Sequence, residues 1–208
     1  TLVTVSYSST VGGTSTGAIT LGAATLVDDV TLTVGAGAAN AISMSTVTGT
    51  TGGGASNLTI NTTGAVTVGA VGTDIGTITV TNSGGTTFSS TVSAATVAIT
   101  STTTGNTVSF SGNLTLTSGM TVGAGSAAYN VSILGSSNSI AGATTFNNTG
   151  TVTLGNSGDT LAFTGGLVAT AAAPSRVYLG GTITAADTGV LNIGAPVTVS
   201  YNSTVGGT

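Results

Sequence analysis

Residues 76–100 read GTITVTNSGGTTFSSTVSAATVAIT, and this stretch contains the pattern that decides the fold. Apolar and polar residues alternate at residues 78–80 (Ile-Thr-Val) and again at residues 97–99 (Val-Ala-Ile), which places them on opposite faces of short β-strands. Residues 82–85 (Asn-Ser-Gly-Gly) between them are of types that favour tight turns. Apolar-polar-apolar triplets recur along the chain roughly every 10 residues, with some at 20, so the sequence predicts many short strands separated by corners.

The composition points to the same all-β class. Only 3% of the residues are charged, and Arg176 is the one basic residue. Mean hydropathy is +0.53 and the net charge is -4, whereas disordered chains combine low hydrophobicity with high net charge. No apolar run approaches the roughly 18–20 residues of a membrane-spanning helix. Gly and β-branched residues outnumber good helix formers, which favours strands over helices.

Triplets this short gain main-chain hydrogen bonds on both sides only when they stack as successive coils. The spacing therefore predicts a right-handed parallel β-solenoid (β-helix) with coils of about 20 residues. Roughly ten such coils at about 4.8 Å each would make a rod about 50 Å long. Tandem β-sandwich modules are the alternative, because sandwiches also have short strands at this spacing.

The alternation also assigns side chains to the inside and the outside of the coil. Outward Thr residues form pairs separated by one residue, and such pairs resemble the surface of ice-binding β-solenoids. Because the pairs are unevenly spaced in the sequence, we expect them to serve only as outward strand residues. The predicted structural core comprises Val5, Leu21, Leu32, Ile60, Ile78, Val80, Val97, Ile99, Phe110, Leu116, Ile133, Leu154, Phe163, Leu179 and Ile193. The predicted outward Thr ladder comprises Thr31, Thr33, Thr77, Thr79, Thr151 and Thr153.

A second and longer repeat joins the two ends of the sequence. Residues 3–14 read VTVSYSSTVGGT and residues 197–208 read VTVSYNSTVGGT, an offset of 194 positions with a single difference between Ser8 and Asn202. The match predicts that residues 1–194 are one tandem repeat unit and that residues 195–208 begin the next.

The residue types needed for most chemistry are missing. The chain has no His, Cys, Lys or Glu, so the usual general bases and activated nucleophiles are absent. We expect no enzymatic activity and no cofactor. The acidic pair Asp28 and Asp29 is interpreted as a turn, with calcium binding between neighbouring coils as a weak alternative. One Arg cannot neutralise a phosphate backbone, so we expect no nucleic-acid partner. We also expect no membrane insertion of this segment.

Blocks such as residues 76–100 and NTVSFSGNLTLTSG (residues 106–119) resemble the β-strand repeats of giant bacterial surface proteins and exoproteins. This group includes autotransporter passengers and filamentous-haemagglutinin-like adhesins. The resemblance implies secretion to the bacterial cell surface and a structural role, and it transfers no catalytic residue. The expected function is a repeat of an extracellular filament, sheath or coat whose main partner is itself. The alternative is an adhesin stalk, with host or cell-surface molecules as further partners.

Overall fold

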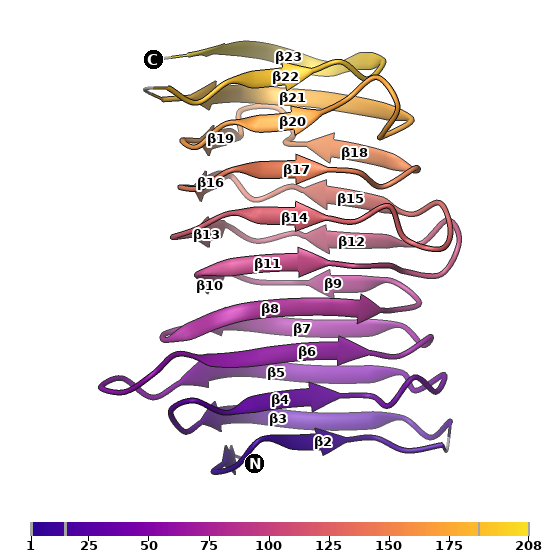
Figure 1. The fold of residues 1–208 in the computed structure, drawn as a ribbon, viewed down its shortest axis with the longest axis vertical. Coiled ribbons are helices and arrows are strands. Elements are labelled where there is room, and N and C mark those ends of the chain that lie inside the picture. Colours follow the sequence, from indigo (N-terminus) through magenta and orange to yellow (C-terminus); the bar gives the residue numbers. More distant parts are fainter. Residues whose placement is uncertain (1, 15, 187, 208) are drawn as a thin grey trace.

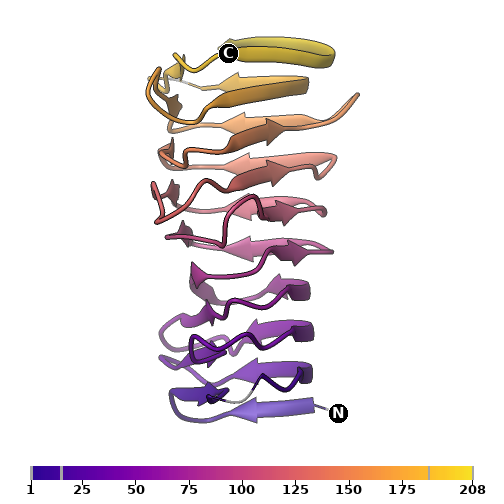
Figure 2. The ribbon, with the colours of Figure 1, turned by 90° about the vertical axis from the view of Figure 1, so that its right-hand side faces the viewer.

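The computed structural model describes residues 2–14, 16–186 and 188–207, and within these ranges the chain contains strands and no helix. The strands stack as a parallel β-solenoid of about 9 turns (Figures 1 and 2). In Figure 1 the nearer strands run from left to right and the fainter ones behind them from right to left while the chain rises, which is the path of a right-handed coil. The predicted solenoid is thus confirmed. The sandwich alternative is wrong, because sandwich sheets pair their strands antiparallel.

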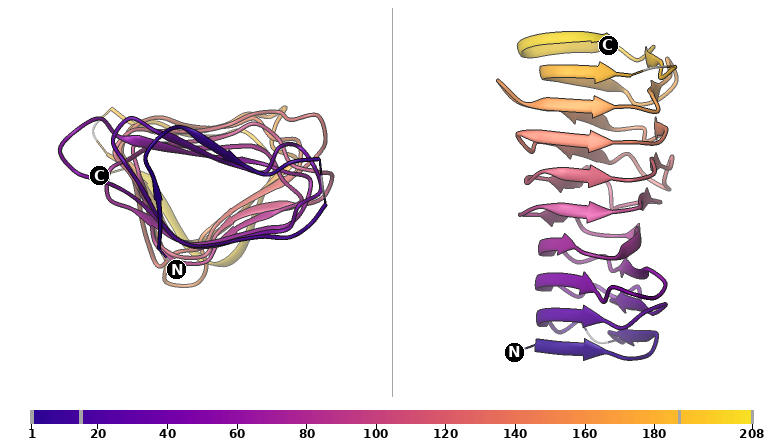
Figure 3. Two further views of the ribbon diagram at one scale, coloured as in Figure 1. Left: turned by 90° about the horizontal axis from the view of Figure 1, so that it is seen from below. Right: turned by 90° about the vertical axis from the view of Figure 1, so that its left-hand side faces the viewer.

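The coil has a triangular cross-section with one sheet surface on each side (Figure 3). We name the sides face A, face B and face C in the order in which the chain passes over them from residue 9 onward. Face A is the nine-stranded sheet nearest the viewer in Figure 1. Its strands are β2 (Ser9–Val11), β4 (Thr31–Val34), β6 (Ser56–Asn61), β8 (Ile75–Asn82), β11 (Thr96–Ile99), β14 (Met120–Val122), β17 (Thr144–Phe146), β20 (Leu167–Ala169) and β22 (Leu191–Ile193).

Faces B and C belong to one 14-stranded sheet that bends around a corner of the triangle. Five strands cover both faces, because each continues through the corner: β3 (Ile19–Leu26), β5 (Ile42–Gly49), β7 (Val66–Gly72), β21 (Arg176–Ala185) and β23 (Val197–Gly207). The strands on face B alone are β9 (Thr86–Phe88), β12 (Thr107–Phe110), β15 (Asn130–Ile133) and β18 (Thr151–Leu154). Those on face C alone are β1 (Leu2–Val5), β10 (Val92–Ala94), β13 (Leu114–Leu116), β16 (Ser137–Ile140) and β19 (Thr160–Phe163).

Successive coils lie about 23 residues apart, so the predicted length of about 20 residues was too short and the predicted number of coils too high. The aligned positions of stacked strands recur from coil to coil, whereas the corners between strands differ in length. Ile78 stacks on Val97, only 19 positions later, whereas Leu32 stacks on Leu58, 26 positions later, because that coil includes a corner loop at residues 50–55. Variable corners therefore add length without disturbing the register of the strands.

The narrow interior is filled by columns of apolar side chains. Phe88 stacks directly on Phe110, with ring centroids 4.8 Å apart and ring planes within 2°. This distance equals the usual spacing of neighbouring strands, so aligned inward side chains touch from coil to coil. Of the predicted core residues, thirteen are buried: Val5, Leu32, Ile60, Ile78, Val80, Val97, Ile99, Phe110, Leu116, Ile133, Leu154, Phe163 and Leu179.

The other two predicted core residues, Leu21 and Ile193, are only partly buried. Both point inward, but each lies at an open end of the described solenoid. Leu21 has no face B strand below it and Ile193 has no face A strand above it among the described residues. Their incomplete burial is therefore a property of the ends and not of the alternation.

Candidate functional site

The outer surface of face B carries at least one hydroxyl-bearing side chain on every coil. These residues pair with one another in register, strand to strand, along the whole stack. Their alternation with buried neighbours places them on the outside of the sheet. We call this set the hydroxyl rank: Thr20, Ser43, Thr67, Thr87, Ser109, Ser132, Thr153, Tyr178 and Thr198.

The members of the hydroxyl rank are not regularly spaced in the sequence. They are 20 positions apart between Thr67 and Thr87 but 25 apart between Thr153 and Tyr178. The corners absorb this difference, so that residues at unequal sequence intervals occupy equivalent positions. Uneven spacing in the sequence therefore does not by itself support the expectation that the outward Thr residues serve only as outward strand residues.

The predicted outward Thr residues lie on two different faces, and all six are partly exposed. Thr31, Thr33, Thr77 and Thr79 lie on face A, and Thr151 and Thr153 lie on face B. On face A, outward Thr residues are stacked in the first four coils and again in the sixth and seventh, but Ala98 and Val168 interrupt the series. Face B thus carries the only rank in the described coils that consists of hydroxyl side chains throughout.

The faces carry almost no charge. Within the described strands Arg176 is the only charged residue, and its Nη1 donates a hydrogen bond of 2.7 Å to Thr198 Oγ1 on the next coil. The sequence alone allows two acidic partners for Arg176, which are Asp187 and an Asp of a following repeat. Asp187 lies outside the described residues. A surface of hydroxyl, amide and methyl groups makes hydrogen bonds and apolar contacts without charge repulsion between molecules.

Asp28 and Asp29 form the turn between β3 and β4, as interpreted from the sequence. The Asp28 carboxylate accepts a 2.6 Å hydrogen bond from the Thr50 hydroxyl of the next coil. The two carboxylates also press against the corner loop above them, where a Cβ on Gly54 would lie 1.8 Å from Asp29 Oδ1. Among the described residues there is no group of three or more His, Cys, Asp or Glu side chains that could hold a metal ion. Both acidic residues therefore have a structural explanation.

Side-chain amides link neighbouring coils where strands begin, and the sequence interpretation missed this role. Asn57 Oδ1 accepts a hydrogen bond from the main-chain N–H of Thr77 (2.8 Å). Asn130 Oδ1 accepts one from Thr151 (2.8 Å). Buried Asn138 accepts one from the N–H of Leu114 (3.0 Å) and donates through Nδ2 to main-chain oxygens. Asn57 and Asn130 lie directly before apolar-polar-apolar triplets, and this position is the signal that would have identified their bridges; Asn138 is not followed by such a triplet.

Tyr129 is the largest fully buried side chain and was also absent from the predicted core. Its hydroxyl donates a hydrogen bond to the carbonyl of Gly123 in the corner between faces A and B. Burial away from water raises the pKa of the Tyr129 phenol above its ordinary value. The residue anchors a corner loop that contains no strand, where the alternation pattern gives no information.

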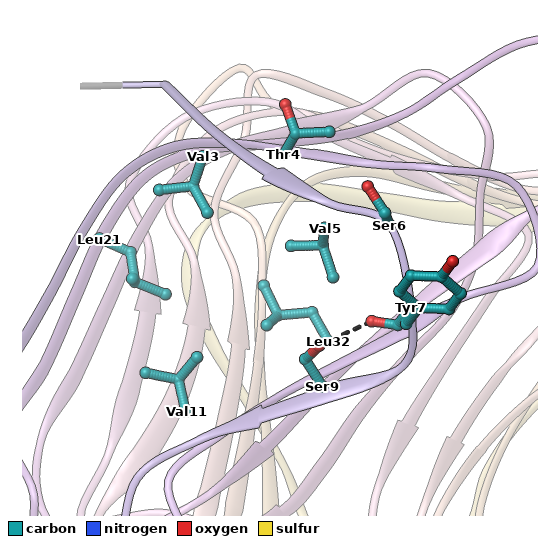
Figure 4. A pocket seen from close by; sticks show the side chains of 9 residues that line it. All are labelled: Val3, Thr4, Val5, Ser6, Tyr7, Ser9, Val11, Leu21 and Leu32. Atoms are coloured by element: carbon teal, nitrogen blue, oxygen red, sulfur yellow. Dashed lines mark hydrogen bonds between the residues drawn. The ribbon is translucent and has the colours of Figure 1, made fainter.

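Both ends of the described solenoid expose apolar surface. Every exposed large apolar side chain among the described residues lies in the first or the last coil: Leu2, Tyr7, Val190, Val197, Val199, Tyr201 and Val205. At the N-terminal end the interior opens into a hollow of about 380 Å³ between Val3, Val11, Leu21 and Leu32 (Figure 4). An uncovered core end with unpaired strand edges is a surface that favours association with another strand layer.

No protein-family model, curated protein or solved structure matches this chain. The resemblance to β-strand repeats of bacterial surface proteins therefore stays a prediction. The part of the chain that the structure describes contains no helical segment suited to span a lipid bilayer. The features available for a functional argument are the uncharged faces, the hydroxyl rank and the open ends.

Proposed function

We propose that this chain is a structural repeat of a large secreted fibrous protein that self-associates into an extracellular filament, sheath or surface coat. The observation that carries the proposal is the hydroxyl rank on face B, which runs in register over every coil and has one charged neighbour, Arg176. Its partner in this proposal is the same face of another copy. In this proposal the chain is not an enzyme and uses no cofactor.

Surface charge of one sign keeps protein molecules apart in solution. Proteins that remain monomeric usually have charged side chains at about a quarter to a third of their surface positions, whereas only 3% of the residues of this chain are charged. Here the described faces offer hydroxyl groups at the repeat distance of the coils, so two copies aligned along their axes present donors and acceptors at matching intervals. One such contact is weak, but a rod repeats it at every coil, and several weak contacts acting together give a stable lateral interface.

The test places charge on the hydroxyl rank. A double variant, Ser43→Lys with Thr87→Lys, puts two positive charges on exposed positions of face B that are two coils apart. We expect the parent chain to form lateral bundles in electron micrographs and to sediment as large particles, and the variant to remain as single rods. The matched control, Thr51→Lys with Thr104→Lys, adds the same charge at exposed corners and should still form bundles. Bundles in both variants, or in neither the parent nor the control, would contradict a role for face B.

An adhesin stalk remains the second candidate, because a stack of about 9 coils is an elongated rod. In that case the segment is a spacer, and host or cell-surface molecules bind elsewhere in the protein. Isolated thin rods of the parent chain at all concentrations, ending at the cell surface in native material, would favour the stalk over the coat.

Ice binding is the remote third candidate, because aligned outward Thr residues would present hydroxyl and methyl groups at a regular interval. Ala98 and Val168 break the Thr series on face A. On face B, Thr is replaced at four positions of the hydroxyl rank, namely Ser43, Ser109, Ser132 and Tyr178. We therefore expect no thermal hysteresis. A measurable difference between the melting and freezing temperatures at millimolar protein concentration would instead favour ice binding over the other two functions.

A further inference from the structure

The two copies of the repeated twelve-residue sequence occupy different faces of the solenoid. Residues 3–5 lie on face C, where they pair with residues 24–26, and residues 9–11 lie on face A. In the second copy, residues 197–199 lie on face B, where they pair with residues 177–179, and residues 203–205 follow on face C. The second copy is therefore displaced by one face relative to the first.

The displacement follows from the number of coils between the copies. Counted on face C, the chain makes eight complete coils from residues 3–5 to the second half of β21. It then crosses face A at β22 and reaches face B at residues 197–199, which adds two thirds of a coil. A repeat of 194 residues thus ends one face short of a whole number of turns.

We infer that consecutive repeats join into one uninterrupted solenoid in which each repeat is turned by one face relative to the repeat before it. In this arrangement, residues 191–193 of one repeat form the strand directly below residues 19–21 of the next. The inference rests on the tandem array of the proposed function and specifies its junction. The partner of each open end is a second copy of the same repeat.

The burial of the end residues supports this junction. The inward side chains of residues 19–21 are Ile19 and Leu21, those of residues 191–193 are Leu191 and Ile193, and all four are only partly buried. Stacking the two segments would cover these side chains with each other. The separation along a continuous array would be 22 positions, which lies between the 19 and 26 seen within the chain.

The exposed valines of β23 fit the same arrangement. Val197 and Val199 point inward above Val177 and Leu179 but are 43% and 62% exposed, because nothing covers them among the described residues. Their counterparts Val3 and Val5 pair with residues 24–26, whose inward side chains are buried. The same pairing in the next repeat would place its residues 24–26 over β23 and bury both valines.

The rotation of each repeat by one face changes which side of the array carries the hydroxyl rank. The hydroxyl rank would lie on face B in one repeat and move to a different side in each of the next two, returning to its first orientation after three repeats. Lateral contacts through this rank would then form on all three sides of a fibre. The expected packing is a bundle with threefold contacts and not a flat sheet.

The test uses a two-repeat chain in which residues 15–208 follow Thr208 directly, so that residues 197–208 also serve as residues 3–14 of the second repeat. The sequence has no Cys, so single cysteines are easily introduced. Asn192→Cys in the first repeat and Thr20→Cys in the second should lie on adjacent strands on the outer surface. Pyrene groups attached to this pair should show strong excimer fluorescence at nanomolar concentration.

The matched control replaces Asn192→Cys with Thr198→Cys and keeps Thr20→Cys in the second repeat. Thr198 lies on face B, so it would adjoin the second Thr20 only if the repeats kept the same orientation. Excimer emission from the control pair, or from neither pair in a chain whose circular dichroism shows intact β-structure, would overturn the inferred turn. In a mixture of chains that each carry only one labelled cysteine, excimer emission arises only between different molecules. This mixture therefore measures lateral self-association separately from the contact inside one chain.

Discussion

The sharpest test of the inside-outside assignment compares two adjacent residues of β8. Ile78 is completely buried between Leu58 below and Val97 above, whereas its neighbour Thr79 points outward and is partly exposed. Ile78→Ala removes three carbon atoms from a packed column, which costs about 2.4 kcal/mol for lost burial alone at about 0.8 kcal/mol per methylene. The cavity left behind raises the expected loss to about 3 kcal/mol. Thr79→Ala should cost no more than about 1 kcal/mol.

Hydrogen exchange is the suitable assay, because each coil contacts only its neighbours and stability is local. A loss of about 3 kcal/mol corresponds to roughly 100-fold faster exchange for the amides of β6, β8 and β11 in the Ile78→Ala variant. The Thr79→Ala variant should change these rates less than about tenfold, and both variants should leave β17 and β20 unaffected. Equal acceleration in the two variants would show that the alternation of inward and outward residues is wrong at this coil.

Three further outcomes are expected. Burial raises the pKa of the Tyr129 phenol, so the contribution of its neutral form to stability is fully present below pH 10. Above about pH 10 the free energy of unfolding should fall by up to about 1.36 kcal/mol per pH unit. Tyr129→Phe should remove this part of the decline in Tm at alkaline pH. Asn138→Ala leaves the buried N–H of Leu114 without its partner and should cost about 1–3 kcal/mol in urea denaturation followed by circular dichroism, whereas the same change at exposed Asn202 should cost less than about 0.5 kcal/mol. A chelator should leave the Tm unchanged, because Asp28 accepts a hydrogen bond from a neighbouring hydroxyl; a drop of several degrees would restore the calcium hypothesis.

The alternation in the sequence was sufficient to predict the strands and most of the core, because inward and outward positions differ in residue type along every strand. Ile78 and Val97 illustrate this, since each is apolar between polar or small neighbours and each is completely buried. The coil length was not predictable in the same way. It depends on the corners, and no local pattern states whether a loop such as residues 50–55 belongs inside one coil or separates two.

The candidate surface was only partly predictable for a related reason. Thr153 was expected to point outward, but its alignment with Ser132 and Tyr178 depends on the register between strands more than 20 positions apart. Buried polar residues were missed because residue type alone does not show direction. Asn138 and Tyr129 are of types that usually occur at surfaces or in corners, and only the three-dimensional path shows that their polar groups satisfy main-chain partners inside.

The direction of the hydrogen bonds between coils has a mechanical consequence. These bonds join each strand to the strands above and below it, so they lie along the length of the rod. Tension applied at the two ends of the chain would break these hydrogen bonds in sequence, one strand at a time. The coils would therefore detach one by one from an end of the rod. Each released coil of about 23 residues extends to about 75–80 Å of chain in place of a rise of about 4.8 Å. Under load the rod would behave as an extensible tether that yields one coil at a time, and a single-molecule stretching trace would record steps whose lengths follow the number of residues in each coil.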